Sequence, residues 1–180
     1  AAADEGGVVV SVGSFTKILA PGLRLGWLEA SAHVIKRIAA RGYMVSGGGV
    51  APFAGEVVSE MLTAGAQAAH VEHLCDDLSA GCGALCSALS AAGCFEFETP
   101  RGGYFVWVQL PEGVSAAALL PVAERHGVAF LPGATCVPTA PADACGRYIR
   151  LCFAWCAVPD LIEGVRRLTA AVKEVQGATA

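Results

Sequence analysis

The pattern of apolar residues in the first quarter of the chain predicts two strands and a helix. Residues 7–12 form a valine-rich run that predicts a buried strand, and residues 23–28 predict the next strand. Ser31 is a typical N-cap for the helix that follows, and Gly42 is expected to end it. The buried side of this helix is expected to consist of Val34, Ile35 and Ile38.

Apolar residues recur at helical spacing through the middle of the chain. Residues 55–92 predict one or two helices, which would bridge two domains. A glycine-rich loop, residues 46–53, precedes them. Its SGGG run does not match a phosphate-binding fingerprint, and a flexible linker is the simpler interpretation.

The last part of the chain alternates apolar and polar residues in a way that predicts a sheet with helices. A helix is expected at residues 115–126, although Pro121 should kink or shorten it. Another begins at Pro159 and carries a clean apolar stripe. The expected strands, of which the first two form a hairpin, are residues 95–98, 104–110, 128–131 and 147–153.

Composition and charge exclude several classes of protein. With 180 residues, of which 54% are hydrophobic and 16% charged, the chain can bury a core in one domain or two small ones. The net charge of −4, with no extended basic cluster, argues against nucleic-acid and acidic-membrane partners; Arg166 and Arg167 are only an adjacent pair. The longest uncharged run, residues 78–95, is broken by glycine and serine, and no cationic signal sequence is present. We expect a soluble protein of the cytoplasm or an organelle lumen that is not secreted.

Eight cysteines raise the question of disulfides or a metal site. Without a secretory signal, and in segments rich in alanine and leucine, these cysteines are expected to be free thiols that serve as small hydrophobic residues. His70, His73 and Cys75 could gather a metal on one side of a helix. Because no second matched pair of ligands exists, we expect no metal site.

The strongest chemical signal lies in residues 11–27, where Lys17 stands near two hydroxyls and an arginine. A lysine amine can condense with a carbonyl, while Arg24 can bind phosphate oxygens through two parallel hydrogen bonds. Ser14 and Thr16 can add hydroxyl donors. This combination suits an aldehyde cofactor that carries a phosphate; the alternative is that Lys17 is a solvated loop residue. The glycines expected to allow positive φ or close approach there are Gly13, Gly22 and Gly26.

A second enzymatic interpretation begins at the same place, because Ser14 and Lys17 satisfy the S-x-x-K pattern of serine acyl-transferases. That chemistry also needs S-D-N and K-T-G motifs. The chain contains no asparagine, and neither of its other lysines is followed by threonine. The acyl-transferase interpretation is therefore rejected.

The segment SFTKILAPGLRLGW resembles the SFSK-x-LAPGLRLGW signature of class I/II pyridoxal-phosphate aminotransferases of fold-type I, nearest to the 2-aminoadipate/kynurenine branch. The resemblance implies that Lys17 forms the Schiff base with pyridoxal 5'-phosphate (PLP). It also implies that Ser14 and Arg24 bind the cofactor phosphate, with Thr16 assisting. Amino acid and 2-oxo acid substrates and a homodimeric parent follow from the same resemblance, as does a place near the subunit interface for the SGGG segment.

Arg150 is an isolated cation within an apolar strand, where alternation puts it on the face opposite Ile149 and Leu151. Such a charge needs a counterion, either a glutamate of this chain or a bound carboxylate. The segment YIRLCFA resembles the family segment whose arginine binds the substrate carboxylate. GGYFVWVQLPEG and VAFLPGATC resemble further small-domain segments, and Tyr104 is assigned to the substrate site on the same basis.

The resemblance covers essentially the whole chain and implies an α/β fold. Residues 1–78 would be the end of the large α/β/α domain with a linker helix. Residues 79–180 would be the small α+β C-terminal domain with a mainly antiparallel sheet. The family's other cofactor contacts lie before the lysine, where this chain has only 16 residues. We therefore expect the C-terminal half of an aminotransferase, or alternatively a non-catalytic remnant that cannot hold PLP by itself.

Overall fold

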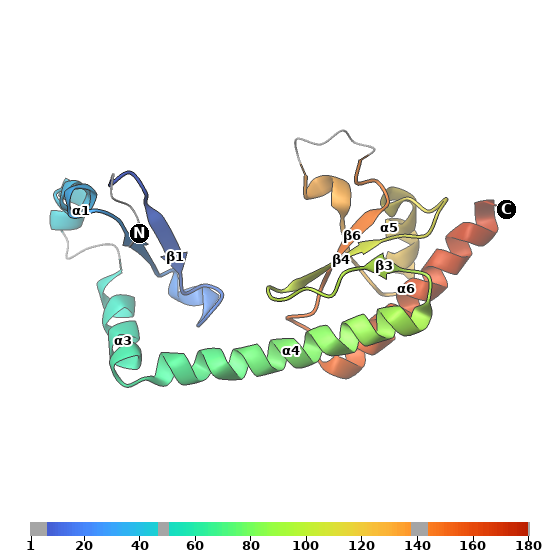
Figure 1. Cartoon of the computed structure of the whole chain (residues 1–180), viewed down its shortest axis with the longest axis horizontal. Coiled ribbons are helices and arrows are strands. Elements are labelled where there is room, and N and C mark those ends of the chain that lie inside the picture. Colours follow the sequence, from blue (N-terminus) through green and yellow to red (C-terminus); the bar gives the residue numbers. More distant parts are fainter. Residues whose placement is uncertain (1–6, 47–50, 138–143, 180) are drawn as a thin grey trace. The chain divides into compact units, whose positions relative to one another are not determined.

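The computed structural model describes residues 7–46, 51–137 and 144–179. The chain divides into two compact units, Ala1–Cys75 and Asp76–Ala180. The boundary falls inside α4, Ala66–Ala92, the long green helix of Figure 1. The assignment of residues 1–78 and 79–180 to two family domains stays a prediction.

The first unit contains a two-stranded antiparallel sheet and several helices, with little buried apolar surface. Within its described residues, Phe15 and Val58 are the only buried hydrophobic side chains. The strands pair from Ser11 opposite Glu29 to Ser14 opposite Gly26. The elements are β1 (Ser11–Ser14), the 3-10 turn η1 (Pro21–Leu23), β2 (Gly26–Glu29), α1 (Ala32–Ala39), α2 (Gly42–Val45), α3 (Pro52–Thr63) and the start of α4.

Burial in this unit differs from the sequence-based expectation. Val8 is 83% exposed, and Val9 and Val10 are also exposed, because β1 begins only at Ser11 and pairs with β2 alone. On α1, Ile35 and Ile38 are exposed, so the predicted buried side of this helix is wrong for the described structure. Apolar patterning shows which side chains would favour a core, but burial requires a neighbouring element to cover them.

Several element boundaries also differ. The strand expected at 23–28 begins at Gly26, because η1 and a left-handed Arg24 occupy the preceding positions. The helix after Ser31 ends at Ala39, and Gly42 begins α2 instead of ending α1. Residues 55–92 form two helices, separated by Gly65 at φ +73°. The SGGG segment and its expected place near a subunit interface fall largely on residues 47–50, outside the described residues.

The second unit is built on a four-stranded antiparallel sheet of order β3-β4-β6-β5 (Figure 1). The predicted mainly antiparallel sheet is confirmed, as is the alternation along β6. Ile149, Leu151 and Phe153 are buried, while Tyr148, Arg150 and Cys152 are more exposed. The expected strand at 128–131 shrinks to a two-residue edge strand. The strands are β3 (Glu96–Phe97), β4 (Phe105–Gln109), β5 (Leu131–Pro132) and β6 (Tyr148–Cys152).

Within the described part of this unit, helices cover one face of the sheet and leave the other face open. The buried cluster joins alternate residues of β4 and β6, such as Val106 and Ile149, to apolar residues of α4, α5 (Ala116–Arg125) and α6 (Val158–Thr179). Ser115 caps α5 by accepting a hydrogen bond from the Ala118 amide at 3.1 Å. The helix continues through Pro121, which therefore does not shorten it. Pro121 is exposed, so water can bond the backbone carbonyl that lost its donor.

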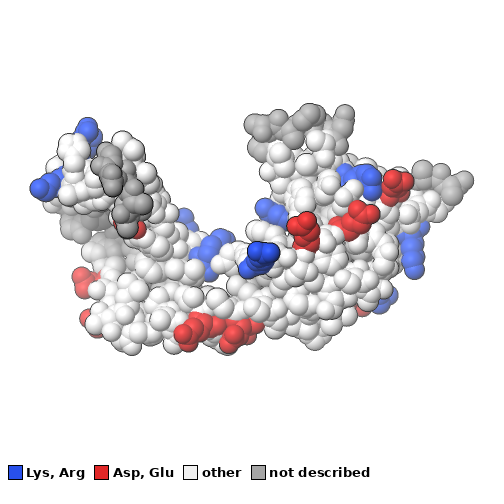
Figure 2. Space-filling view, viewed as in Figure 1, with Lys and Arg blue, Asp and Glu red and all other residues white. Residues whose placement is uncertain are grey.

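All eight cysteines are free thiols, as predicted, and Cys86 lies in the core of the second unit. No helix among the described residues is both long enough and apolar enough to cross a membrane. Figure 2 shows acidic and basic side chains scattered over the surface with wide uncharged areas between them.

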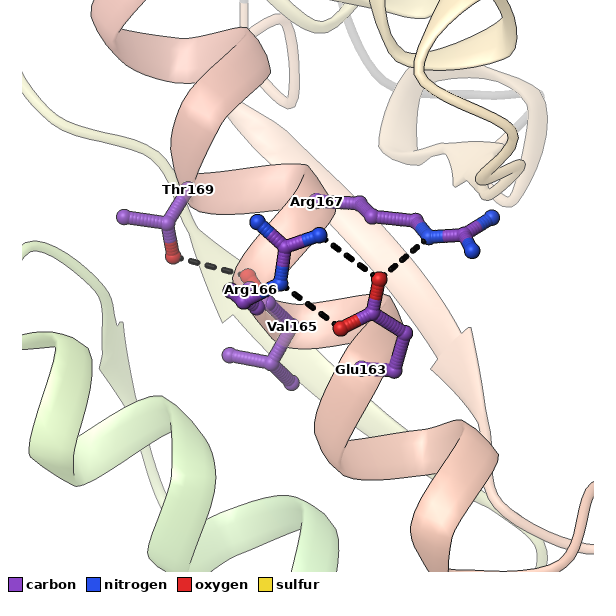
Figure 3. A network of polar contacts seen from close by, with 5 residues as sticks. All are labelled: Glu163, Val165, Arg166, Arg167 and Thr169. Atoms are coloured by element: carbon purple, nitrogen blue, oxygen red, sulfur yellow. Dashed lines mark hydrogen bonds and ion pairs between the residues drawn. The ribbon is translucent and has the colours of Figure 1, made fainter.

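A network of charged side chains lies on α6 (Figure 3). Glu163 accepts two hydrogen bonds of 2.7 Å from Arg166 and one of 2.8 Å from Arg167. The spacings of three and four residues place all three side chains on one side of the helix. The two hydrogen bonds from Arg166, followed by the one from Arg167, lower the pKa of Glu163 to about 2.

Replacing Ile149 by alanine is expected to lower the free energy of unfolding of the second unit by about 2–5 kcal/mol, because its side chain is fully buried. Ile162→Ala is the matched control, since this isoleucine of α6 is 49% exposed and its loss should cost less than about 1 kcal/mol. Urea denaturation followed by circular dichroism measures both. Equal losses would show that the described core is not the one that stabilises the unit.

The Glu163 carboxyl is expected to titrate near pH 2 in the folded protein, against 4.5 when unfolded. Because its pKa is lower in the folded state, its contribution to stability is complete above pH 4.5 and is lost as the pH falls towards 2. Arg166→Gln should move this pKa back towards 4.5. A carbon-detected NMR titration of the side chain measures it, and an unchanged pKa in the variant would rule out Arg166 as the main cause.

Candidate functional site

The pairing of β1 with β2 closes a loop that carries Lys17. Beyond the last pair, Ser14 with Gly26, the Phe15 amide donates a hydrogen bond of 3.0 Å to the Leu25 carbonyl. The Phe15 carbonyl then accepts bonds from the amides of Leu19 and Ala20, at 2.9 and 3.1 Å. Lys17 lies within this turn and is exposed.

Two hydroxyl groups meet at the start of the loop. Ser14 Oγ donates to Thr16 Oγ1 at 2.8 Å, and the Thr16 amide donates to Ser14 Oγ at 3.1 Å. This local turn, of a kind that serine commonly forms, places both hydroxyls within hydrogen-bonding distance of each other. The structure therefore brings together the two hydroxyl residues that the sequence predicts for one site.

Arg24 lies on the returning side of the same loop. The hydrogen bond between Phe15 and Leu25 extends the strand pairing, so Thr16 and Arg24 are the next residues along the two chain segments. Arg24 is the one non-glycine residue with positive φ in the described part of the chain, at 49°. Its Nη1 donates to the Pro21 carbonyl at 3.3 Å, and none of the described carboxylates pairs with it. The Arg24 guanidinium is exposed, and its other N–H groups can still donate to an anion.

Two of the three predicted glycines are required by close contacts. A Cβ added at Gly13 would lie 2.0 Å from the Trp27 ring, and one at Gly26 would lie 2.5 Å from the Gly13 carbonyl. Trp27 in turn lies 4.9 Å from the buried ring of Phe15, centroid to centroid. The expectation for Gly22 is wrong, because a Cβ there has open space and its φ is not positive.

The second unit holds Arg150 and Tyr104. Arg150 lies on β6 with its guanidinium carbon 4.0 Å from the Phe105 ring centroid, a cation–π contact. No described glutamate or aspartate forms an ion pair with it, so the alternative of an internal salt bridge is not found there. Tyr104 precedes β4, and its ring lies 6.4 Å from that of Phe105. Both predicted substrate residues thus contact or neighbour Phe105.

The open face of the sheet around Arg150 is aromatic. Trp107, directly opposite Arg150 in the register, stacks on Tyr148 with ring centroids 5.6 Å apart. Phe105 and Trp107 are 41% and 36% exposed. One isolated cation among exposed rings suits a ligand that has a carboxylate and an apolar part.

Two further residues support the candidate site residues, Phe105 beside Arg150 in the second unit and Gln67 beside the Lys17 loop in the first unit. The sequence predicts Phe105 only as part of a strand, and its position under Arg150 follows from the pairing of β4 with β6. Gln67 donates to the Ile18 carbonyl at 2.7 Å, across 49 residues. Its only sequence signal is that it is a polar residue among alanines. In the described part of the chain, no cluster of three or more histidine, cysteine, aspartate or glutamate side chains could hold a metal ion.

Gly13→Ala is expected to displace the Trp27 indole, because the new Cβ would overlap its ring. Gly22→Ala is the matched control in the same loop, where nothing lies within 4 Å. The Trp27 indole N–H resonance in a proton–nitrogen NMR spectrum should shift strongly in the first variant and stay in place in the second. The same shift in both would contradict this contact.

The chain was compared with protein families and with known proteins, and it matches an aminotransferase family. The family profile described as aminotransferase class I and II matches residues 1–168. The chain is 30% identical over 174 residues to an uncharacterized HTH-type transcriptional regulator of Bacillus subtilis, YdfD, covering 96% of this chain and 35% of that protein. It is 31% identical over 173 residues to aromatic-amino-acid aminotransferase 1 of Thermococcus litoralis, covering 95% and 40%.

Among solved structures, the α-aminoadipate aminotransferase LysN of Thermus thermophilus, complexed with N-(5'-phosphopyridoxyl)-L-leucine, superposes with a TM-score of 0.77. It is 28% identical, and the match covers 94% of this chain and 43% of that chain. This chain thus spans about two fifths of the length of the proteins it matches. Its α/β architecture is that of fold-type I aminotransferases, and the chain belongs to the class I and II aminotransferase family.

Proposed function

We propose that this chain carries the covalent cofactor site and the carboxylate site of a PLP-dependent aminotransferase, which transfers an amino group from an amino acid to a 2-oxo acid. The observation that supports it best is the Lys17 loop, where the lysine lies near two bonded hydroxyls and an arginine that pairs with none of the described carboxylates. Family membership supports the same conclusion. The chain spans about two fifths of its relatives, so the activity is a proposal for the whole protein.

The donors on the loop fit a phosphorylated aldehyde. Ser14, Thr16 and Arg24 offer hydroxyl and guanidinium donors for the phosphate, and the Lys17 amine is a nucleophile for the aldehyde. When bound, PLP supplies an electron sink for the charge that develops when the substrate Cα proton leaves.

The remaining steps belong to side chains of this chain. With the cofactor bound, the Lys17 amine would take the proton from the substrate Cα as a general base and would hold it on Nζ for return as a general acid. Arg150 binds the substrate carboxylate, and Phe105 beneath it limits the positions of the guanidinium. Tyr104 borders the same ring and is assigned to the substrate site.

The finer assignments rest on the family. The proposed substrates are amino acids of the 2-aminoadipate, kynurenine or aromatic type, in line with the names of the relatives and with the exposed rings beside Arg150. A homodimer, and domains at residues 1–78 and 79–180, are proposed on the same resemblance.

A second candidate is an aminotransferase-like part of a protein that does not transaminate. The similarity to YdfD, which is named as a transcriptional regulator, favours it. In that case Lys17 and Arg24 would bind PLP but no amino group would be transferred, or the chain would not bind PLP at all. Covalent binding of the cofactor and transfer of the amino group are therefore separate measurements.

Treating the chain with PLP and then borohydride is expected to give a stable adduct on Lys17. Phosphate binding should direct the aldehyde to that lysine, so Lys36 and Lys173 serve as internal controls in peptide mass spectrometry. Hydrogen bonds to a charged group contribute about 1.5–3 kcal/mol. The adduct on Lys17 should therefore be about tenfold or more abundant than the adducts on Lys36 and Lys173. Equal labelling of all three lysines would remove the support for the site.

Pyridoxal, which lacks the phosphate, provides the matched probe. Ser14, Thr16 and Arg24 should favour PLP over pyridoxal at Lys17, and Arg24→Lys should narrow that preference because an ammonium cannot reproduce the planar fork. An unchanged preference in the variant would show that Arg24 does not bind the phosphate. Single-turnover conversion of several amino acids with 2-oxoglutarate, measured on a protein as long as the relatives, then decides between the two candidates. Conversion supports the aminotransferase, and an adduct on Lys17 without conversion supports the second candidate.

A further inference from the structure

Gln67 links the beginning of α4 to the loop of Lys17. Its Nε2 donates to the carbonyl of Ile18, the residue after Lys17, at 2.7 Å. The two residues are 49 positions apart, so the bond joins segments that local sequence does not hold together. It is a hydrogen bond from a side chain of α4 directly to the backbone of the lysine turn.

The environment of Gln67 is unusual for an amide. At 6% exposure, it is the only buried polar residue in the described part of the chain. Its Oε1 has no hydrogen-bond partner among the described residues. Burying an amide with one end unpaired is unfavourable, so an apolar side chain of similar size would pack there at lower cost.

His70 adds a second buried polar atom on the same side of α4. It lies three residues after Gln67, and its Nε2 is also buried without a partner among the described residues. Gln67 and His70 thus place two buried polar atoms without partners among the described residues on one side of α4, in a unit that buries only two large apolar side chains in its described part. The bond from Gln67 to the Ile18 carbonyl joins this side of α4 to the loop.

From this we infer that Gln67 is a positioning residue, which fixes the turn of Lys17 through the Ile18 carbonyl and so orients the lysine amine towards an aldehyde. The inference rests on the proposed function of Lys17. It assigns Gln67 no contact with cofactor or substrate, and its effect is transmitted through the backbone of the loop. The amides of Leu19 and Ala20, which donate to the Phe15 carbonyl within the turn, should therefore become less protected when the bond from Gln67 is lost.

The test compares Gln67→Met, which keeps the length of the side chain but removes its donor, with Thr63→Val. Thr63 Oγ1 donates to the Ser59 carbonyl at 2.9 Å, so this control loses a bond of the same kind in the same unit. Hydrogen exchange of the Leu19 and Ala20 amides is measured in the 180-residue chain without cofactor. Gln67→Met should lower their protection about five- to tenfold, and Thr63→Val should leave it unchanged.

Gln67→Glu supplies a rescue that packing alone would not give. A protonated carboxyl can donate to the Ile18 carbonyl and an ionised one cannot, so protection relative to the unmodified chain should return below about pH 5. His70 and Lys17 are present in every variant. Gln67→Met is therefore measured above and below about pH 5 as well. Its amide protection relative to the unmodified chain should be the same at both pH values, which corrects for these other groups.

The rate of the borohydride-trapped adduct on Lys17 completes the test. Gln67→Met should slow it by the same factor as it lowers loop protection. Unchanged protection, or lowered protection with an unchanged adduct rate, would overturn the positioning role. If the unmodified chain forms no adduct on Lys17, the proposed function fails for this chain, and a positioning role for Gln67 towards the amine falls with it; the exchange data then show only whether Gln67 orders the loop.

Discussion

The close approach of β1 and β2 at two glycines is the contact on which the candidate site depends. With no side chain at Gly13, the Trp27 ring can lie over the strand, and with none at Gly26, the Gly13 carbonyl can approach. This approach brings Ser14 and Arg24 onto facing segments of one loop although ten positions separate them. Sterics at two positions therefore determine where the cation stands relative to the hydroxyls.

The second unit reaches its arrangement by a different route, through a packed core. Helices cover one face of the sheet, and the register of β4 with β6 assigns each residue to the covered or the open face. Arg150 falls on the open face, where Phe105 contacts its guanidinium. A cation held over an aromatic ring keeps its hydrogen-bond donors at the edge of its plane available, which is the geometry that a carboxylate uses.

The sequence allowed the residues of the loop to be predicted because its motif is local. Lys17 and its neighbours lie within eleven positions, and hydrogen bonds inside the loop suffice to bring Ser14 and Thr16 together. The alternation of β6 was equally accessible, since period-two patterning needs no knowledge of partners. Both predictions used information carried by adjacent residues.

What the sequence could not show depends on partners far along the chain. The exposure of Val8 depends on which strands are present beside it, and the roles of Phe105 and Gln67 depend on contacts across 45 and 49 positions. The glycines show the same limit, because Gly13 and Gly22 look alike in sequence and only one of them has a ring against it.

The left-handed backbone of Arg24 has a further consequence. An arginine in this conformation is less stable than glycine by about 1 kcal/mol, since its Cβ crowds the following carbonyl. Position 24 is thus one where backbone stability favours glycine, while the proposed binding of phosphate needs the arginine. A protein optimised for thermal resistance alone would acquire glycine there, and with it a better folded loop that has lost its cation.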